Sequence, residues 1–196
     1  MTHHVIYVPG LGDAKAQGQE LVTKLWRPLG VQGHYVPLRW AVDEPWKLKL
    51  QHLLDAIDAL SKTGTVSLVG TSAGASAVLQ AYALRKDKVA GVVCICGKIN
   101  HPETVNPRYY TENPAFKDAL AQLQAALPGL SAADRDHILS IHPLWDGTVS
   151  PADTILPGAH ERTLLTVGHP FSIFCALTFG APGMMRFLKR QAQQFR

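Results

Sequence analysis

Short apolar segments rich in β-branched residues alternate with longer segments of helical periodicity along the whole chain. Such alternation predicts a mostly parallel β-sheet covered by helices on both faces. Six segments have the length and composition of strands: residues 5–8, 35–38, 66–69, 89–95, 138–141 and 163–167. We therefore expect a three-layer, doubly wound α/β fold with about six strands, in one domain spanning residues 1–196.

Between the predicted strands, apolar residues recur at the spacing of amphipathic helices. One stripe is expected to be core, in a helix that ends at Gly30: Leu21, Val22, Leu25, Trp26 and Leu29. A second stripe follows Pro45 and is also expected to be core: Trp46, Leu50, Leu53, Leu54, Ile57 and Leu60. A third group, near the carboxyl terminus, is either core or interface, with core favoured: Phe179, Met184, Met185 and Phe187.

Residues 98–136 interrupt this regularity, because four prolines punctuate a segment that is longer than an ordinary connection. The segment is interpreted as either a short cap over a functional site or a flexible insertion. Within it, Ser131 stands three residues before Asp134, a spacing typical of a capping box, which predicts another short helix before the next strand.

Composition and charge narrow the functional classes. Lys and Arg exceed Asp and Glu by four in 196 residues, and the basic residues are too scattered to indicate a nucleic-acid-binding surface. No apolar run reaches the roughly 18 residues that a membrane-spanning helix needs, and the amino terminus shows no secretory leader. We expect a cytoplasmic protein without a membrane span.

The three cysteines do not provide a disulfide framework. Cys94 and Cys96 lie two residues apart in a predicted strand, so alternation places both on one face as small core residues. A zinc site would need further Cys or His ligands at the usual spacing, and no such spacing occurs around them. We expect neither a metal nor a cofactor.

The chemistry-bearing motif is Gly70-Thr71-Ser72-Ala73-Gly74, which follows a predicted strand and precedes a helix of small residues. This G-x-S-x-G pattern is typical of a sharp strand-to-helix turn that presents a nucleophilic serine above the sheet. Glycines flank Ser72 because side chains there would collide with the neighbours of the turn. The alternative is a tight turn without chemistry.

A serine nucleophile also needs N–H donors for the oxyanion. The backbone N–H of Ala73, at the start of the helix, is one candidate because it lies at the positive end of the helix dipole. The backbone N–H of Leu11, in the loop after the first predicted strand, is the other. Alternatively, Gly10 and Gly12 form a strand-to-helix turn capped by Asp13, and both interpretations can hold together.

A general base and an acid that orients it complete the requirement. Of nine histidines, only His169 directly follows a strand-like segment near the end of the chain and precedes a helix, so it is the favoured base. Asp146 closes the preceding predicted strand and is the favoured acid, with Asp153 as its competitor.

With a serine on a strand turn, an acid and a histidine in that order, the chain resembles the α/β-hydrolase family, especially its compact members. The resemblance covers nearly the whole chain and rests on four motifs: the oxyanion loop "PGLGD" (9–13), the nucleophile elbow "GTSAG" (70–74), the acid loop "DGTVSP" (146–151) and the histidine loop "GHPFSI" (168–173). Two positions depart from the family pattern: Pro9 replaces a frequent histidine, and Thr71 stands where many members carry histidine or tyrosine.

The resemblance implies acyl transfer to water, with Ser72 as nucleophile, His169 as base and a small-molecule ester as substrate. It also places a cap at residues 98–136, where we expect three aromatic residues either to wall an apolar acyl pocket or merely to anchor the segment: Tyr109, Tyr110 and Phe116. A short-chain carboxylesterase is the first expectation. Thioesterase, lipase, amidase or peptidase activity stays open, as does a non-catalytic binding protein, and either a monomer or a homodimer.

A dinucleotide-binding fold is the main rival, because a strand and two glycines open the chain. Its fingerprint fails, since Gly10 and Gly12 are followed by Lys15 where a third glycine or an alanine belongs. No phosphate-binding G-x-x-x-x-G-K-[ST] motif occurs either.

Overall fold

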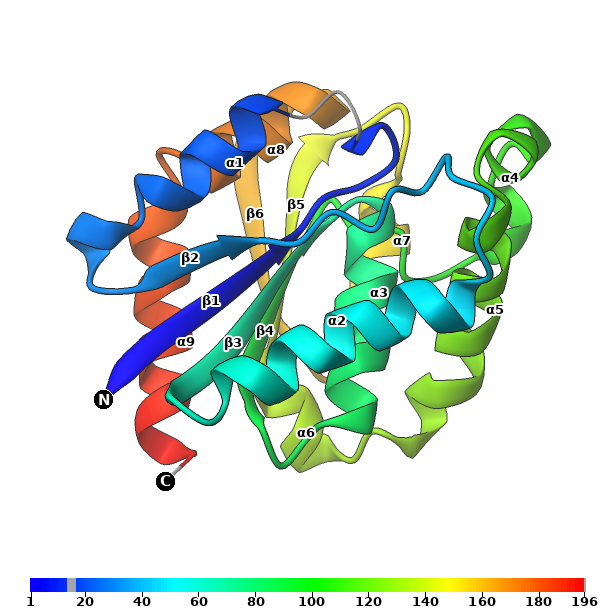
Figure 1. Cartoon of the computed structure of the whole chain (residues 1–196). Coiled ribbons are helices and arrows are strands. Elements are labelled where there is room, and N and C mark those ends of the chain that lie inside the picture. Colours follow the sequence, from blue (N-terminus) through cyan, green and yellow to red (C-terminus); the bar gives the residue numbers. More distant parts are fainter. Residues whose placement is uncertain (14–16, 196) are drawn as a thin grey trace.

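The computed structural model describes residues 1–13 and 17–195 (Figure 1), so Lys15 lies outside the described residues. Within these residues, six parallel strands form one sheet in the order β2-β1-β3-β4-β5-β6. The strands are β1 (Thr2–Val8), β2 (Gln32–Tyr35), β3 (Gly64–Thr71), β4 (Val89–Ile95), β5 (Ile138–Trp145) and β6 (His160–Val167). The predicted α/β class and the parallel sheet are confirmed.

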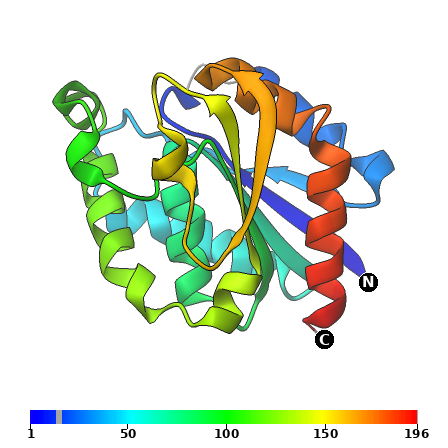
Figure 2. The same cartoon turned by 180° about the vertical axis from the view of Figure 1, so that it is seen from behind.

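Helices cover both faces of the sheet, which gives three layers (Figures 1 and 2). One face is covered by α2 (Trp46–Leu60), α3 (Ala73–Leu84) and α5 (Pro114–Ala126), and the other by α1 (Gln17–Lys24), α8 (His169–Leu177) and α9 (Ala181–Gln194). The short helices are α4 (Pro107–Glu112), α6 (Ala132–Asp136) and α7 (Pro151–Thr154), with 3₁₀ turns at Arg27–Leu29, Pro102–Thr104 and Leu127–Gly129.

Alternate strand residues point into two separate cores. Ile6 of β1 and Leu68 of β3 belong to the core under α2, α3 and α5, whereas Val5 and Val69 belong to the core under α8 and α9. Every residue of the central strand β4 is buried, as expected for a strand with helices on both sides. Because all strands are parallel, their carboxyl ends meet at one edge, where the loops after β1, β3, β5 and β6 come together.

The second strand begins and ends earlier than predicted. β2 covers Gln32–Tyr35, whereas the apolar pattern pointed to residues 35–38. β2 is an edge strand that pairs only with β1, so a polar sequence is tolerated there. Val36 still donates its N–H to Tyr7, but Pro37 has no N–H and ends the ladder.

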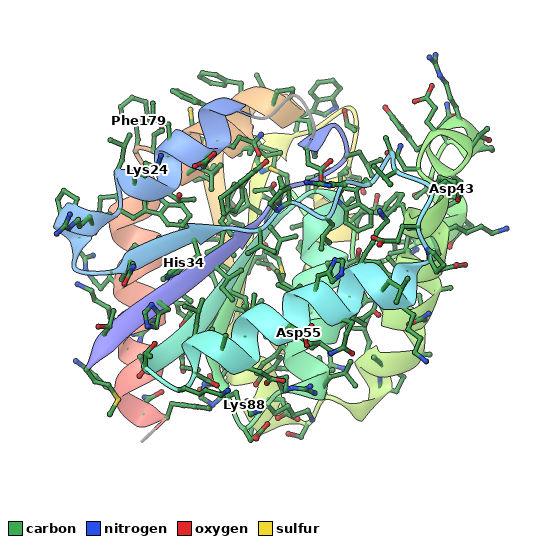
Figure 3. All side chains as sticks on the ribbon, in the orientation of Figure 1. Lys24, His34, Asp43, Asp55, Lys88 and Phe179 are labelled. Carbon is green, nitrogen blue, oxygen red and sulfur yellow. The ribbon has the colours of Figure 1, made fainter. Side chains whose placement is uncertain are left out.

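Two of the predicted core stripes are only partly correct. Leu21 and Leu25 are each 60% exposed, and Phe179 is 81% exposed, whereas Trp26 is buried. α1 ends at Lys24, so the periodicity through Leu29 spans a break and its residues do not share one face. Phe179 lies in the connection before α9, outside the helical stripe, and Figure 3 shows its side chain at the periphery of the molecule. Met184, Met185 and Phe187 are buried as expected.

Cys94 and Cys96 do not share one face, contrary to the prediction from alternation. Cys94 packs in the core under α3, and Cys96 packs in the core under α8 and α9. The strand ends at Ile95, and Cys96 has a positive φ of 45°, so the period of two breaks at this residue. Both cysteines are buried and unpaired, as expected.

Residues 98–136 combine a peripheral part with a part of the body. α4 projects at the periphery (Figures 1 and 2), whereas α5 buries Phe116, Ala119 and Leu120 in the core that it shares with α2 and α3. The predicted capping box is confirmed, because the Ser131 hydroxyl accepts from the Asp134 N–H at 3.1 Å and the Asp134 carboxylate accepts from the Ser131 N–H at 2.7 Å.

No single described helix has both the length and the apolar composition of a membrane span. The helices α8 and α9 meet these two criteria only together, across a bend of 61°.

Candidate active site

Ser72 occupies the turn between β3 and α3 in a strained backbone conformation, with φ of 52° and ψ of −122°. A non-glycine residue in this region costs about 1–3 kcal/mol and persists only where the surroundings hold it. The Ser72 N–H donates to the Ile95 carbonyl at 3.0 Å, and the Ser72 carbonyl accepts from the N–H groups of Ala75 and Lys98, each at 3.1 Å. These bonds to two neighbouring segments hold the turn in place.

The two glycines of the motif allow close approaches on both sides of this turn. A Cβ on Gly70 would lie 2.6 Å from the Gly74 carbonyl oxygen, and a Cβ on Gly74 would lie 2.3 Å from the Val8 carbonyl oxygen. α3 therefore begins in direct contact with the end of β1. The small residues that follow Ser72 serve the same close packing of helix against sheet.

His169 and Asp146 are hydrogen-bonded to each other. His169 is the first residue of α8, directly after β6, and Asp146 directly follows β5. The His169 Nδ1 lies 2.6 Å from the Asp146 Oδ2. The other carboxylate oxygen of Asp146 accepts from the N–H groups of Thr148 at 2.8 Å and Val149 at 3.1 Å, which fixes the carboxylate. An ionised carboxylate only accepts, so Nδ1 carries the proton and Nε2 is left as an acceptor.

Asp153, the competing acid, has a different partner. Its Oδ2 lies 2.9 Å from the Nζ of Lys98, and both side chains are buried. Three other histidines have acidic partners of their own: His142 with Glu161, His160 with Asp136, and His101 with Glu103. The geometry thus pairs His169 with Asp146 and not with Asp153.

The two candidate oxyanion donors lie in the cavity that contains Ser72. Leu11 and Ala73 both line it, together with Gly10. Neither backbone N–H donates to another residue in the described part of the chain. Asp13 follows this loop and accepts from the N–H groups of Arg39 at 2.5 Å and Trp40 at 3.3 Å. Asp13 therefore fixes the loop against the segment after β2.

The cavity has a volume of about 830 Å³ and is lined by Ser72, by His169 and by two of the three aromatic residues expected to form a pocket. Tyr109 and Phe116 line it. Tyr110 is not among the described lining residues: its hydroxyl donates to the Pro102 carbonyl at 2.9 Å, and its ring packs on Phe116 at 5.6 Å. Of the three aromatic residues, Tyr110 thus matches the alternative expectation, that of an anchor.

Several residues of the cavity wall were not predicted as site residues from the sequence. α1 and α8 contribute Val22, Ile173, Phe174 and Leu177, and Lys98 contributes a buried cation. Val22 lies in a stripe interpreted wholly as core, whereas Ile173 is the last residue of the histidine motif and Phe174 directly follows it. For Ile173 and Phe174, the short distance from His169 along the sequence was the one feature that could have indicated a place in the site. Lys98 carried no signal, because one lysine after a strand has no characteristic pattern.

Cys96 is a further neighbour of the acid and the histidine. Its sulfur, an Asp146 oxygen and a His169 nitrogen lie within 4.8 Å of one another, the one such group of metal-ligating atoms found in the described residues. Burial, followed by the charge of Asp146, raises the pKa of the Cys96 thiol to about 12. A thiol that stays protonated is a poor nucleophile, and Cys96 packs in the core under α8 and α9, next to the acid and the histidine.

Comparisons with known proteins were made at the levels of sequence and fold. No family model and no curated protein matches the sequence. Solved structures do match the fold. Est1E from Butyrivibrio proteoclasticus superposes with a TM-score of 0.72 at 13% identity, over 97% of this chain and 88% of that chain.

Two further structures agree with Est1E. The monoacylglycerol lipase of Paleococcus ferrophilus gives a TM-score of 0.63 at 14% identity, over 96% of this chain and 94% of its own. A protein of Xanthomonas campestris pv. campestris, described as a hydrolase of the alpha/beta superfamily, gives 0.63 at 15% identity, over 95% and 98% of the two chains. Together with the six-stranded parallel sheet, these similarities show that the chain has the α/β-hydrolase fold.

Proposed function

We propose that this protein is a serine hydrolase that cleaves carboxylic esters through an acyl-enzyme, with Ser72 as nucleophile, His169 as general base and Asp146 as orienting acid. The observation that carries the proposal is the 2.6 Å bond between His169 and Asp146, in the wall of the cavity that also presents Ser72 on a strained turn. The names of the fold neighbours, an esterase and a lipase, support the same reaction class.

The proposed reaction uses these three side chains and the two backbone donors. His169 Nε2 takes the proton of the Ser72 hydroxyl while Oγ forms a bond to the ester carbonyl carbon, and the N–H groups of Leu11 and Ala73 receive the developing oxyanion. His169 then gives the proton to the leaving alcohol, and the acyl-enzyme remains. Water attacks it with His169 again as base, which releases the acid and restores Ser72. Asp146 stabilises the imidazolium throughout.

We propose ester cleavage ahead of thioester or amide cleavage because the fold neighbours include a monoacylglycerol lipase. The choice of an ester concerns the substrate alone and is independent of the assignment of Ser72 as nucleophile. A panel of p-nitrophenyl esters graded by acyl length, run beside thioester and amide substrates, measures it. Good amide turnover without ester hydrolysis would overturn the ester assignment while keeping Ser72.

An active-site-directed fluorophosphonate tests the nucleophile itself. The wild-type protein should be labelled, and Ser72→Ala should not. Ser140→Ala is a matched control, since the Ser140 hydroxyl is buried in β5 with no hydrogen-bond partner among the described residues. Its removal should leave both the fold and the labelling intact. A folded wild-type protein that resists labelling would favour a non-catalytic binding protein.

A further inference from the structure

The cavity around Ser72 has two sides of different chemistry. Figures 1 and 2 both place α1 and α8 on one side of the carboxyl edge of the sheet and α4 on the other. The side formed by α1 and α8 is largely apolar, with Gln19 as a polar exception: Val22, Pro170, Ile173, Phe174 and Leu177. The cap side combines two apolar residues, Val105 and Phe116, with groups that can form hydrogen bonds: Lys98, Thr104, Asn106 and Tyr109.

Lys98 is the buried cation of this cap side. The residue is only 4% exposed. Its Nζ lies 2.9 Å from the Asp153 Oδ2 and donates to the Thr104 hydroxyl at 2.6 Å. An ammonium group has three N–H donors, and these two acceptors, both within the described residues, account for two of them. A buried charge is expensive unless its donors are satisfied, and an oxygen atom in the cavity that Lys98 lines, from water or from a ligand, can accept the third N–H.

Backbone hydrogen bonds fix both residues of the ion pair between Lys98 and Asp153. The Lys98 main-chain N–H donates to the Ser72 carbonyl at 3.1 Å. The main-chain carbonyl of its partner, Asp153, accepts from the N–H groups of Ile99 at 2.9 Å and Asn100 at 3.0 Å. The ion pair therefore joins the segment after β4 to α7, and it is a rigid part of the wall. Rigid placement is what a binding group needs to discriminate between ligands.

We propose that Lys98 is a substrate-binding residue, which donates its third N–H to an oxygen atom of the ester on the cap side of Ser72 while the hydrocarbon part lies between α1 and α8. This inference rests on the proposed ester hydrolysis at Ser72. Asp153 neutralises the charge of Lys98, so a neutral hydroxyl, ether or carbonyl oxygen fits better than a carboxylate. The substrate class is thus an ester with one apolar side and one oxygen-bearing side.

Matched pairs of esters that differ by one oxygen test this assignment. On the acyl side, p-nitrophenyl methoxyacetate is compared with p-nitrophenyl butyrate; on the alcohol side, 2-hydroxyethyl butyrate is compared with propyl butyrate. Each kcat/KM is divided by the rate of alkaline hydrolysis, which removes differences in intrinsic reactivity. The wild-type enzyme should prefer the oxygen-bearing member of one pair by about tenfold, the effect of one hydrogen bond to a charged donor.

Lys98→Met should reduce this ratio to about one, whatever its effect on the two rates separately. Since Lys98→Met leaves the Asp153 carboxylate buried without its cation, the double variant Lys98→Met/Asp153→Asn is measured beside it and should show the same loss. Thr104→Val is the matched control: it removes one acceptor but keeps the ammonium, so the preference should persist. Thermal unfolding of each variant identifies those that fold.

The outcomes separate this inference from the proposed function. A wild-type ratio near one in both pairs would overturn the role of Lys98, and so would a ratio that survives in Lys98→Met and in the double variant. In both cases hydrolysis of the plain butyrate esters would still support the esterase. Absence of hydrolysis of every ester would reject the esterase proposal and this inference with it.

Discussion

His169 and the histidines of β1 and β2 show how one residue type is placed in different surroundings around the same sheet. At the carboxyl edge, His169 Nδ1 faces a buried carboxylate at 2.6 Å. Near the amino edge, His4 Nδ1 lies 3.0 Å from the Nε2 of His34, and the nearest partner of the His3 ring is the Ser67 hydroxyl at 2.9 Å. Only the first arrangement offers a counter-charge to an imidazolium.

The difference shows that burial without a counter-charge favours the neutral form of a histidine. Burial lowers the pKa of His4 and of His34, with the charge of His4 adding to the effect on His34. The pKa of His3 falls to about 4 through burial first and then through the nearby charges of Lys189 and His4. These rings are held neutral as packing and hydrogen-bonding groups, whereas a general base must carry a proton during turnover.

The largest effect on kcat is expected from His169→Ala. Without the base, kcat for p-nitrophenyl butyrate should fall by about 10⁴-fold or more. His34→Ala is the control from the other edge: it should lower the thermal unfolding temperature but leave kcat close to that of the wild type. Substantial turnover by His169→Ala would show that another group takes the proton of Ser72.

Asp146→Asn should have the next largest effect. The carboxylate uses one oxygen for the Thr148 and Val149 N–H groups and the other for His169. An asparagine can keep the first set with its carbonyl oxygen, but its NH₂ then faces Nδ1 and favours the wrong tautomer. We expect kcat to fall by about 10³–10⁴-fold with a near-native unfolding temperature.

The control for Asp146→Asn is Asp136→Asn, which removes the charge beside the exposed ring of His160. Its kcat should be unchanged, because surface ion pairs contribute little and this one lies away from the cavity. Equal losses in the two variants would contradict the assignment of Asp146 as the orienting acid.

A smaller loss is expected for Gly10→Ala, which disturbs the geometry of the nucleophile and leaves its charge partners in place. The added Cβ would lie 2.7 Å from the Ser72 Cβ and 3.3 Å from its Oγ, so one of the two segments must shift. A displacement of the nucleophile by about 1 Å costs up to about 10²-fold in rate. Steady-state kinetics should show a kcat/KM lowered about 10- to 100-fold, whereas Gly129→Ala, with nothing within 4 Å of its added Cβ, should be unaffected.

The smallest effect concerns stability at the amino edge. His3 binds its proton near pH 6.5 when unfolded but near pH 4 when folded. Between these values the unfolded state holds more protons, so the free energy of unfolding should fall as the pH is lowered from 6.5 towards 4. His3→Gln stays neutral and should lose less stability in this window, as measured by urea denaturation at pH 7.5 and 4.5.

For this stability prediction the control is His52→Gln, at an exposed position of α2. It should reproduce the pH dependence of the wild type. Identical slopes for His3→Gln and the wild type would contradict the assignment of acid sensitivity to His3.

The strands and the helix layers were largely predictable because they follow from patterns within short segments. The runs at residues 66–69 and 89–95 lie in strands that are buried on both sides, and the Gly-x-Ser-x-Gly turn lies between β3 and α3. Predictions failed where a pattern continued across a backbone break. Leu25 and Phe179 appeared to extend helical stripes, but the helices end before or begin after them.

By itself, the sequence determined the fold class and the identity of Ser72, Asp146 and His169 as candidates, because strand-end residues of a parallel sheet necessarily meet at one edge. Only the tertiary structure decided that His169 pairs with Asp146 while Asp153 pairs with Lys98. Both aspartates follow the same strand, so the local pattern could favour Asp146 but could not show which of the two contacts His169. Their partners come from segments far away in the chain, and side-chain geometry between such segments is set by packing.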